Sequence, residues 1–389
     1  MTPSVLHVIP ALAPRYGGPS VAVVGMCRAL TIAGASVLVA TTDADGPDRL
    51  PVTVGQVQDW EETPTIFFRR RFGESYKWSA GLVHWLQSHV RDFDLVHVHA
   101  VFSHASLSAG KACREAGVPY VVRPLGTLDP WSLDRHALRK KVLFRLAARQ
   151  FLSGASAMHY TSDEERRLAE RGMPWLPPGV VVPLGVDERL FDASDRAVPA
   201  GPYVLALSRL DAKKGLELLI AAFHGLAHDT TCARWTLVIA GAGDSAYVDR
   251  LRQLTHDGAA ASRIVFRGWV DGADRAALFQ GASLFALPSH QENFGVALAE
   301  AMASGVPVLV GPGVNLGRGL EAAGAGWVVL QECDAWHAAL VHAMTHDLER
   351  TDGGRNARRF AEQFRWPTVA AQLLAMYDRV RHPAAQLGS

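Results

Sequence analysis

Two glutamates, Glu292 and Glu300, lie eight residues apart around the start of an apolar segment. From Gly295 the sequence GVALAEAMAS is apolar on nearly every side of a predicted helix, and such a helix is buried. A buried carboxylate is costly unless something pairs with it. Glu300 therefore requires either an arginine in an ion pair or a ligand whose hydroxyl groups donate hydrogen bonds. Glu292, in the loop before the helix, can face the same pocket.

The start of this helix is a candidate anion site. Backbone N–H groups at a helix N-terminus point outward, and the helix dipole favours a negative charge there. We expect a diphosphate to meet this end of the helix, beside Asn293, Phe294, Gly295 and Val296. A second segment, Ser208–Gly215 (SRLDAKKG), follows another predicted strand and offers two cations, Arg209 and Lys214. By itself that segment is equally typical of a solvated surface turn.

These residues need a scaffold that brings strand ends together. Short apolar segments alternate with longer mixed segments, which predicts α/β structure with parallel strands and intervening helices. The segment Pro183–Pro202 is rich in turn formers and acids, and it predicts a linker between two doubly wound, Rossmann-like sheets. Ligands bind beyond the carboxyl ends of such strands. The predicted strands are Val5–Ile9, Ser36–Thr41, Leu95–His99, Tyr120–Arg123, Ala157–Tyr160 and Val180–Val182, then Tyr203–Leu207, Thr236–Ala240, Ile264–Arg267, Leu284–Leu287 and Val308–Val310.

Two short motifs are weak. Gly241–Ala246 fits the dinucleotide pattern G-x-G-x-x-G/A, but the next predicted strand ends without the acid that would hold a ribose. A tight strand-to-helix turn is the better interpretation. Asp43-Ala-Asp45 resembles a metal-binding D-x-D, yet it runs into a D-G-P turn and has no third ligand. We therefore predict no metal and no resident cofactor.

The first half offers a glycine pair and several histidines. Gly17 and Gly18 precede a predicted helix, where they would let backbone close over a ligand or would simply form a loop. Strand alternation places His97 and His99 on one face, with His99 at the carboxyl end. Together with His104 these residues suggest a metal, but no carboxylate or cysteine completes a tetrahedral set.

Composition excludes several classes of protein. The 389 residues are 49% apolar and 20% charged, and the net charge of +1 gives no reason to expect nucleic-acid binding. The four cysteines are scattered, as in a reducing cytoplasm. No apolar segment is long enough to span a membrane, and the amino-terminal sequence enters a strand at once. We expect a cytoplasmic protein, at most peripheral at the inner face of the cell membrane.

Taken in order, the motifs resemble the family 4 (group 1) retaining glycosyltransferases, which have the two-domain GT-B fold. Glu292-x7-Glu300 matches the E-x7-E signature of the family, and Arg209 with Lys214 matches its diphosphate pair. The turn Phe266–Val270 (FRGWV), with Gly268, Trp269 and Val270, resembles the segment that contacts the nucleobase. Pro183–Asp187 (PLGVD) resembles the entry to the linker. The resemblance implies an acceptor-binding domain at residues 1–182, a linker at 183–200, a donor-binding domain at 201–365 and a C-terminal helix within 366–389 that packs back on the first domain.

The resemblance also implies roles for single residues. Glu292 contacts the donor sugar, Glu300 the ribose, and Ser208 lies with Arg209 and Lys214 at the diphosphate. The Gly17-Gly18 loop faces the donor across a central cleft, and His99, favoured over His104, stabilises positive charge near the reacting carbon. Val121–Trp131 resembles an acceptor-side loop, with Arg123, Gly126 and nearby His104 as contacts. It has Pro-Leu-Gly where many members have His-Gly, which leaves the acceptor open.

The expected reaction is a front-face transfer of a hexose from a UDP- or GDP-sugar, in which the leaving phosphate takes the acceptor proton. Its acceptor would be a saccharide or a lipid-linked saccharide, as in exopolysaccharide or lipopolysaccharide assembly. A basic segment with Lys141, Arg145 and Arg149 at four-residue spacing would lie on anionic lipid or would be an ordinary surface helix. The alternatives are a GT-B nucleotide-sugar epimerase, a soluble small-acceptor transferase and a catalytically silent nucleotide-binding scaffold.

Overall fold

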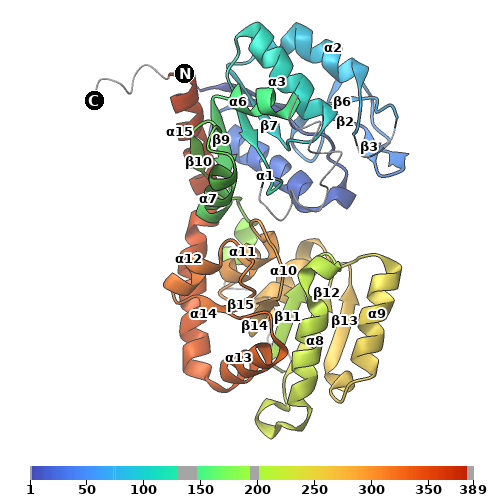
Figure 1. Cartoon of the computed structure of the whole chain (residues 1–389), viewed down its shortest axis with the longest axis vertical. Coiled ribbons are helices and arrows are strands. Elements are labelled where there is room, and N and C mark those ends of the chain that lie inside the picture. Colours follow the sequence, from blue (N-terminus) through green and yellow to red (C-terminus); the bar gives the residue numbers. More distant parts are fainter. Residues whose placement is uncertain (1, 73, 75, 129–146, 193–200, 383–389) are drawn as a thin grey trace, which may run out of the picture. The chain divides into compact units, whose positions relative to one another are not determined.

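The computed structural model describes residues 2–72, 74, 76–128, 147–192 and 201–382. The chain divides into two compact units, which are Met1–Gly185 with Trp366–Ser389, and Val186–Arg365. In Figure 1 the first unit is coloured blue to green with the last helix in dark red, and the second is yellow-green to orange. Each unit is built on its own largely parallel sheet with helices packed against it.

The first unit has an eight-stranded sheet in the order β10-β9-β8-β7-β1-β2-β6-β5, in which only β5 is antiparallel to its neighbour. The strands are β1 Ser4–Val8, β2 Ser36–Thr42, β5 Val57–Asp59, β6 Pro64–Phe68, β7 Leu95–His99, β8 Tyr120–Arg123, β9 Ala157–Tyr160 and β10 Gly179–Val181, with β3 Ala44–Asp45 and β4 Asp48–Arg49 as a separate hairpin. The helices are α1 Gly18–Ile32, α2 Ala80–His89, α3 His104–Ala116, α6 Arg149–Ser153, α7 Asp163–Gly172 and α15 Trp366–Arg381.

The last helix, α15, belongs to the first unit although it follows the second unit in sequence. Its apolar residues Val369, Leu373 and Met376 share one core with α1 and with strand residues such as Val5. At its start the Trp366 ring lies where a side chain on Gly25 of α1 would project. A second core on the other side of the sheet contains α2 and α3.

The second unit has a six-stranded parallel sheet in the order β13-β12-β11-β14-β15-β16. The strands are β11 Tyr203–Leu207, β12 Thr236–Ala240, β13 Ile264–Gly268, β14 Leu284–Leu287, β15 Val308–Val310 and β16 Gly326–Val328. The helices are α8 Leu216–His224, α9 Ser245–His256, α10 Gly272–Gly281, α11 Val296–Ala303, α12 Gly317–Ala322, α13 Cys333–Thr345 and α14 Asp347–Ala361.

The predicted α/β class with two Rossmann-like sheets is confirmed. All eleven predicted strands are present, with ends that differ by no more than one residue. Five strands were missed, namely β3, β4, β5, β6 and β16. Four of these have only two or three residues, which is too short for a local pattern to separate them from loops, and β6 begins with a proline.

Candidate functional site

The carboxylate of Glu300 is held by an arginine. Helix α11 begins after Gly295, which adopts a left-handed conformation with φ 74°, and Leu298–Ala303 are buried. Glu300 accepts a hydrogen bond from Nε of Arg275 on α10 at 3.1 Å, and a second from Nη2 of the same guanidinium. Burial raises the pKa of Glu300, and the adjacent Arg275 opposes that increase. Of the two partners that the sequence allowed, the structure contains the arginine.

Glu292 forms its ion pair with Lys214, the cation predicted to lie near it. Their side chains are 19% and 14% exposed. The backbone N–H of Glu292 donates to Gly313 O at 2.9 Å, which fixes the loop before α11. Lys214 ends a turn in which Asp211 accepts the N–H of Lys213 at 3.0 Å. The structure thus joins the two motifs of the second unit, which are 78 residues apart in sequence.

Around this pair lie unused donors. The N–H groups of Phe294, Gly295 and Val296, at the amino end of α11, have no hydrogen-bond acceptor among the described residues. Arg209 is exposed just after β11, next to Ser208, whose hydroxyl donates to the Arg209 carbonyl at 3.1 Å. N–H groups without an acceptor at a helix start, together with the exposed Arg209, suit an anionic ligand.

Several glycines of this unit make room for backbone. A side chain on Gly215 would collide with Pro288 O, so this glycine lets two backbone segments of the protein approach each other closely. Side chains on Gly241 and Gly243 would collide with Ser208 O and Leu210 O. These two glycines therefore pack the loop after β12 against the loop after β11, which agrees with a tight turn in place of a dinucleotide site.

The turn after β13 is open. Gly268 has φ 70° and no atom within 4 Å of the place where a side chain would begin. Trp269 is 64% exposed, and Val270 follows it. Such an exposed ring offers a flat apolar surface to a nucleobase.

In the first unit, Gly17 also has open space where a side chain would begin, and its φ of 70° requires glycine before the start of α1 at Gly18.

Asp43 and Asp45 hold no shared site, because each pairs with a different arginine. Asp43 lies 3.6 Å from Arg69, and Asp45 lies 3.2 Å from Arg15. The aspartates are thus used in local structure.

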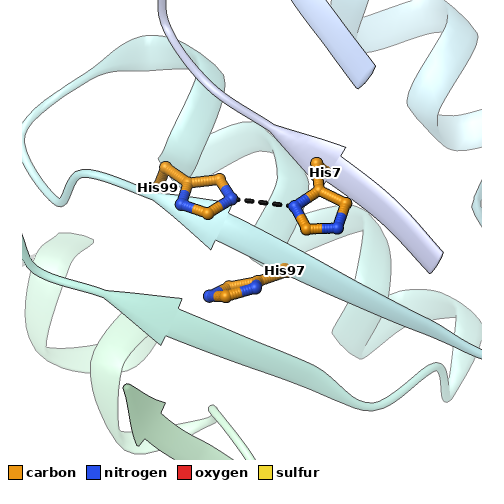
Figure 2. Close-up of side chains that lie close together, drawn as sticks. All are labelled: His7, His97 and His99. Atoms are coloured by element: carbon orange, nitrogen blue, oxygen red, sulfur yellow. Dashed lines mark hydrogen bonds between the residues drawn. The ribbon is translucent and has the colours of Figure 1, made fainter. Parts of the chain in front are cut away.

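The carboxyl end of this sheet holds a buried cluster of histidines. His7 of β1 and His97 and His99 of β7 converge there (Figure 2), and His159 of β9 joins them. The register pairs His7 with His97 on adjacent strands, which places both rings on one face. All four histidines are 0% exposed. Sequence reasoning found His97 and His99 but missed His7 and His159, because only strand pairing shows that they are neighbours.

The four histidines of the cluster are uncharged at neutral pH. Burial, followed by the charge of Arg123, lowers the pKa of His7 to about 3, and burial also lowers the pKa of His159 to about 3. Burial holds the pKa of His97 and His99 well below the usual value of 6.5. The rings are linked by hydrogen bonds, with His7 Nδ1 3.0 Å from His99 Nε2 and His159 Nδ1 3.1 Å from His97 Nε2.

A metal ion fits this cluster poorly, although ligand nitrogens of His7, His97 and His99 lie within 4.8 Å of one another. Both nitrogens of His97 already have partners, Tyr377 and His159. The buried guanidinium of Arg123 adds a positive charge beside the rings. Glu165 acts on the charge of Arg123, but the candidate ligand group of His7, His97 and His99 contains no carboxylate, so a second cation would be costly.

The residues predicted on the acceptor side lie apart. Arg123 is only 2% exposed within the histidine cluster, so it does not lie on an open surface. The N–H of Gly126 donates to Glu165 at 2.8 Å, which is a structural contact. His104 begins α3 and packs against Tyr76 and Trp78, with ring centroids 5.6 and 5.5 Å away. It is therefore not part of the cluster that contains His99.

The basic segment lies mostly outside the described residues, which exclude Lys141 and Arg145. Arg149 begins α6, where its guanidinium lies 5.4 Å from the ring of Trp175. Among the described residues, no helix has the length and apolar character that crossing a bilayer requires.

Two family models match the chain, one for each unit. "Glycosyl transferase 4-like domain" matches residues 17–185, and "Glycosyl transferases group 1" matches residues 189–360. The chain belongs to the group 1 glycosyltransferases. Its fold is GT-B, and it is similar to sucrose-phosphate synthase from Thermosynechococcus elongatus (TM-score 0.77, 21% identity, 98% of this chain and 100% of that one). It is also similar to Anabaena HepE in complex with UDP and glucose (TM-score 0.74, 21% identity, 97% and 99%).

Curated relatives include the phosphatidyl-myo-inositol mannosyltransferase of Mycolicibacterium smegmatis, 32% identical over 53% of this chain and 51% of the relative. Another is the mannosylfructose-phosphate synthase of Agrobacterium fabrum, 29% identical over 55% of this chain and 49% of the relative. The chain thus spans about half the length of these two relatives.

Proposed function

We propose that this group 1 glycosyltransferase is a retaining enzyme that transfers a hexose from a nucleotide-sugar donor to an acceptor hydroxyl. The observation that supports this most is the joined site of the second unit. There an ion pair links Glu292 to Lys214, Arg209 is exposed, and free N–H groups begin α11. The second unit would bind the donor and the first the acceptor.

The nucleotide would be held through three contacts. The diphosphate lies against Arg209, Lys214 and the start of α11, and the base lies beside Gly268, Trp269 and Val270. Glu300 accepts hydrogen bonds from the ribose hydroxyls. Its pair with Arg275 uses one acceptor site on each oxygen, and a carboxylate has about four such sites, so two remain for the ligand. Arg275 also keeps this carboxylate oriented before the ligand arrives.

In the proposed reaction the bond between the anomeric carbon and the leaving phosphate oxygen breaks, and a bond to the acceptor oxygen forms on the same face. The departing phosphate takes the proton of the acceptor hydroxyl. Arg209 and Lys214 stabilise the charge that grows on the diphosphate, as preorganised cations do in a transition state. Glu292, held by Lys214, would meet the hydroxyl groups of the sugar. His99 would lie near the reacting carbon.

The donor is proposed to be a UDP- or GDP-sugar. Two similar proteins support this proposal. HepE was solved with UDP. A relative from Mycobacterium tuberculosis, 30% identical over 52% of this chain, is named a GDP-mannose-dependent mannosyltransferase. The acceptor is proposed to be a saccharide or lipid-linked saccharide of exopolysaccharide, lipopolysaccharide or another glycoconjugate. Two cations take the place that a metal would have at the diphosphate, so activity should survive EDTA.

The test is a panel of UDP-, GDP- and ADP-sugars with the full-length chain, followed by slow hydrolysis and by thermal stabilisation. We expect one nucleotide class to be hydrolysed with retained anomeric configuration, as read by NMR of the freshly released sugar. Inverted configuration would refute the front-face reaction. Isomerisation of the donor without transfer would indicate an epimerase, and binding without turnover would indicate a scaffold.

We also propose a peripheral location at the membrane, which is tested separately by flotation of the chain with liposomes that contain phosphatidylglycerol and with liposomes that lack anionic lipid. Co-flotation that needs the anionic lipid supports a peripheral location and a lipid-linked acceptor, and its absence with both liposome types excludes them.

A further inference from the structure

In the hydrogen bonds of His159 and His97, the non-histidine partners Val182 and Tyr377 determine which nitrogen donates and which accepts. Val182 O lies 2.8 Å from His159 Nε2, and a carbonyl oxygen only accepts, so Nε2 has the proton. Nδ1 of the neutral His159 ring then accepts from His97 Nε2, which lies 3.1 Å away. His97 Nδ1 is consequently unprotonated, and it accepts from the hydroxyl of Tyr377 at 2.8 Å. The carbonyl oxygen of Val182 at one end and the hydroxyl of Tyr377 at the other thus fix which nitrogen has the proton on His159 and on His97.

His99 is held by two of the three other histidines, His7 and His97. Its Nε2 shares one proton with His7 Nδ1 at 3.0 Å, and the two rings are stacked at 10° with centroids 5.3 Å apart. The His97 ring lies on it with centroids 4.3 Å apart. This leaves His99 Nδ1 as its only nitrogen without a partner among the described residues, although the atom is buried.

A buried nitrogen without a partner is costly, and in native proteins such atoms usually have a water molecule or a ligand group beside them. His99 Nδ1 lies at the carboxyl end of β7, where ligands of parallel sheets bind. A sugar hydroxyl can both donate and accept, so it can satisfy Nδ1 whichever ring of the His7–His99 pair has the shared proton.

We propose that His7 and Tyr377 are positioning residues that orient His99 and fix the protons around it, so that its Nδ1 meets a hydroxyl group of the donor sugar. His7 acts by its direct hydrogen bond. Tyr377 acts through His97, the ring that lies against His99. This inference rests on the proposed function, because it assumes that His99 contacts the donor.

The proton arrangement can be measured without any substrate. Histidine-selective ¹⁵N labelling of the full-length chain and long-range proton–nitrogen NMR report the tautomer of each ring. We expect His97 and His159 to be neutral with the proton on Nε2 at pH 7. In Tyr377→Phe the signals of His97 should change. In the matched control Tyr160→Phe they should not, because the Tyr160 hydroxyl is buried without a partner among the described residues.

Kinetics test whether this arrangement matters to the reaction. The probes are UDP-glucose and GDP-mannose, assayed by hydrolysis. His7→Leu, which keeps the size but loses the hydrogen bond, should lower kcat about tenfold with the donor KM within about twofold. His7→Asn should restore most of the rate, since an asparagine amide occupies the place of Nδ1.

Tyr377→Phe should lower kcat about threefold, and Tyr160→Phe should not lower it. A hydroxyl that donates to a ring nitrogen stabilises the neutral ring, so its loss raises the pKa of His97. The acidic limb of the kcat profile should therefore move to higher pH in Tyr377→Phe alone.

The outcomes separate the two proposals. If His99→Ala abolishes hydrolysis while His7→Leu and Tyr377→Phe behave as wild type, the positioning role is wrong and the proposed function stands. If His99→Ala is as active as wild type, the assumed role of His99 is wrong and the positioning role is wrong with it. If the wild type hydrolyses neither donor, the proposed function is wrong for these donors, and the kinetic comparison is made with the donor that the panel identifies. A His97 or His159 proton on Nδ1 in the wild type would overturn the directional network.

Discussion

The two units of the chain satisfy their buried polar groups in opposite ways. In the second unit each acid of the E-x7-E pair meets a cation, Glu292 with Lys214 and Glu300 with Arg275. In the first unit the cluster at the carboxyl end of the sheet contains four uncharged histidines and Arg123, and its rings are joined mainly to one another.

This difference shows how each site depends on its surroundings. Opposite charges in the second unit neutralise one another before any ligand is present, while exposed groups such as Arg209 remain for an anion. The histidines of the first unit owe their neutral state to burial, so their hydrogen bonds depend on packing between β1, β7, β9 and α15. Changes in the second unit should therefore act on binding and rate, and changes of pH should act mainly on the first.

The largest expected effect concerns Arg209. Arg209→Ala removes a cation from the departing diphosphate, and losing one such preorganised group costs about 2.7–4 kcal/mol of transition-state stabilisation. Turnover of the donor should fall roughly a hundredfold or more while the melting temperature stays unchanged. Arg355→Ala on the surface of α14 is the control and should keep wild-type turnover. Near wild-type turnover of Arg209→Ala would refute its assignment.

An intermediate effect is expected for the pair Glu300 and Arg275. Their side chains are 12% and 28% exposed, so solvent screens part of the interaction. Glu300→Ala should cost about 2 kcal/mol of unfolding free energy, less than the loss of one partner of a fully buried pair. Urea unfolding of Glu300→Ala, Arg275→Ala and the double variant measures the coupling. Additive losses would show that the two side chains do not stabilise each other.

The smallest expected change, counted for one histidine over one pH unit, is the loss of unfolding free energy of the first unit in acid. His7 and His159 have a folded pKa of about 3, below the unfolded value of 6.5, so the unfolded chain binds protons that the folded chain does not. Stability should be complete above pH 6.5 and should fall as the pH decreases toward 3, by about 1.4 kcal/mol per pH unit for each such histidine. Cys27 and Glu165 also face the cluster, through Tyr377 and Arg123 respectively.

Hydrogen exchange read by mass spectrometry at pH 7.5 and 5.0, corrected for intrinsic rates, separates the two units. Peptides of the first unit should lose more protection than those of the second, where the raised pKa of Glu300 acts in the opposite sense. His159→Gln keeps a donor for Val182 O but does not titrate, so it should reduce the difference. The exposed His256 provides the control, since His256→Gln should not change it. Equal losses in both units would contradict the prediction.

Much of the second unit could be predicted from sequence because its signals are local. Glu292 and Glu300 are separated by a fixed spacing around an apolar helix, and Arg209 and Lys214 follow one strand. Even so, the sequence left Glu300 with two possible partners, and Arg275 has no marker that connects it to α11. That choice depends on how α10 packs against α11.

In the first unit, the sequence predicted the main strands but not which side chains on different strands lie next to one another. The strand Leu95–His99, and the position of His97 and His99 on one face of it, follow from alternation. His7 and His159 occur in ordinary apolar strands with no flanking signal. Arg123, which the resemblance to the family places on the acceptor side, is buried beside the histidine rings.

The sequence by itself thus determined two α/β sheets and the residues that follow each strand, since these depend on periodicity and spacing along the chain. The nucleotide-sugar role of the acids and cations comes from the resemblance of their motifs to the family. Only the tertiary structure decided which cation meets which acid, and that residues from three strands and the last helix share one buried cluster. The physical reason is that strand order and register, and the return of α15, bring together residues as far apart as His97 and Tyr377, whose contact no local pattern encodes.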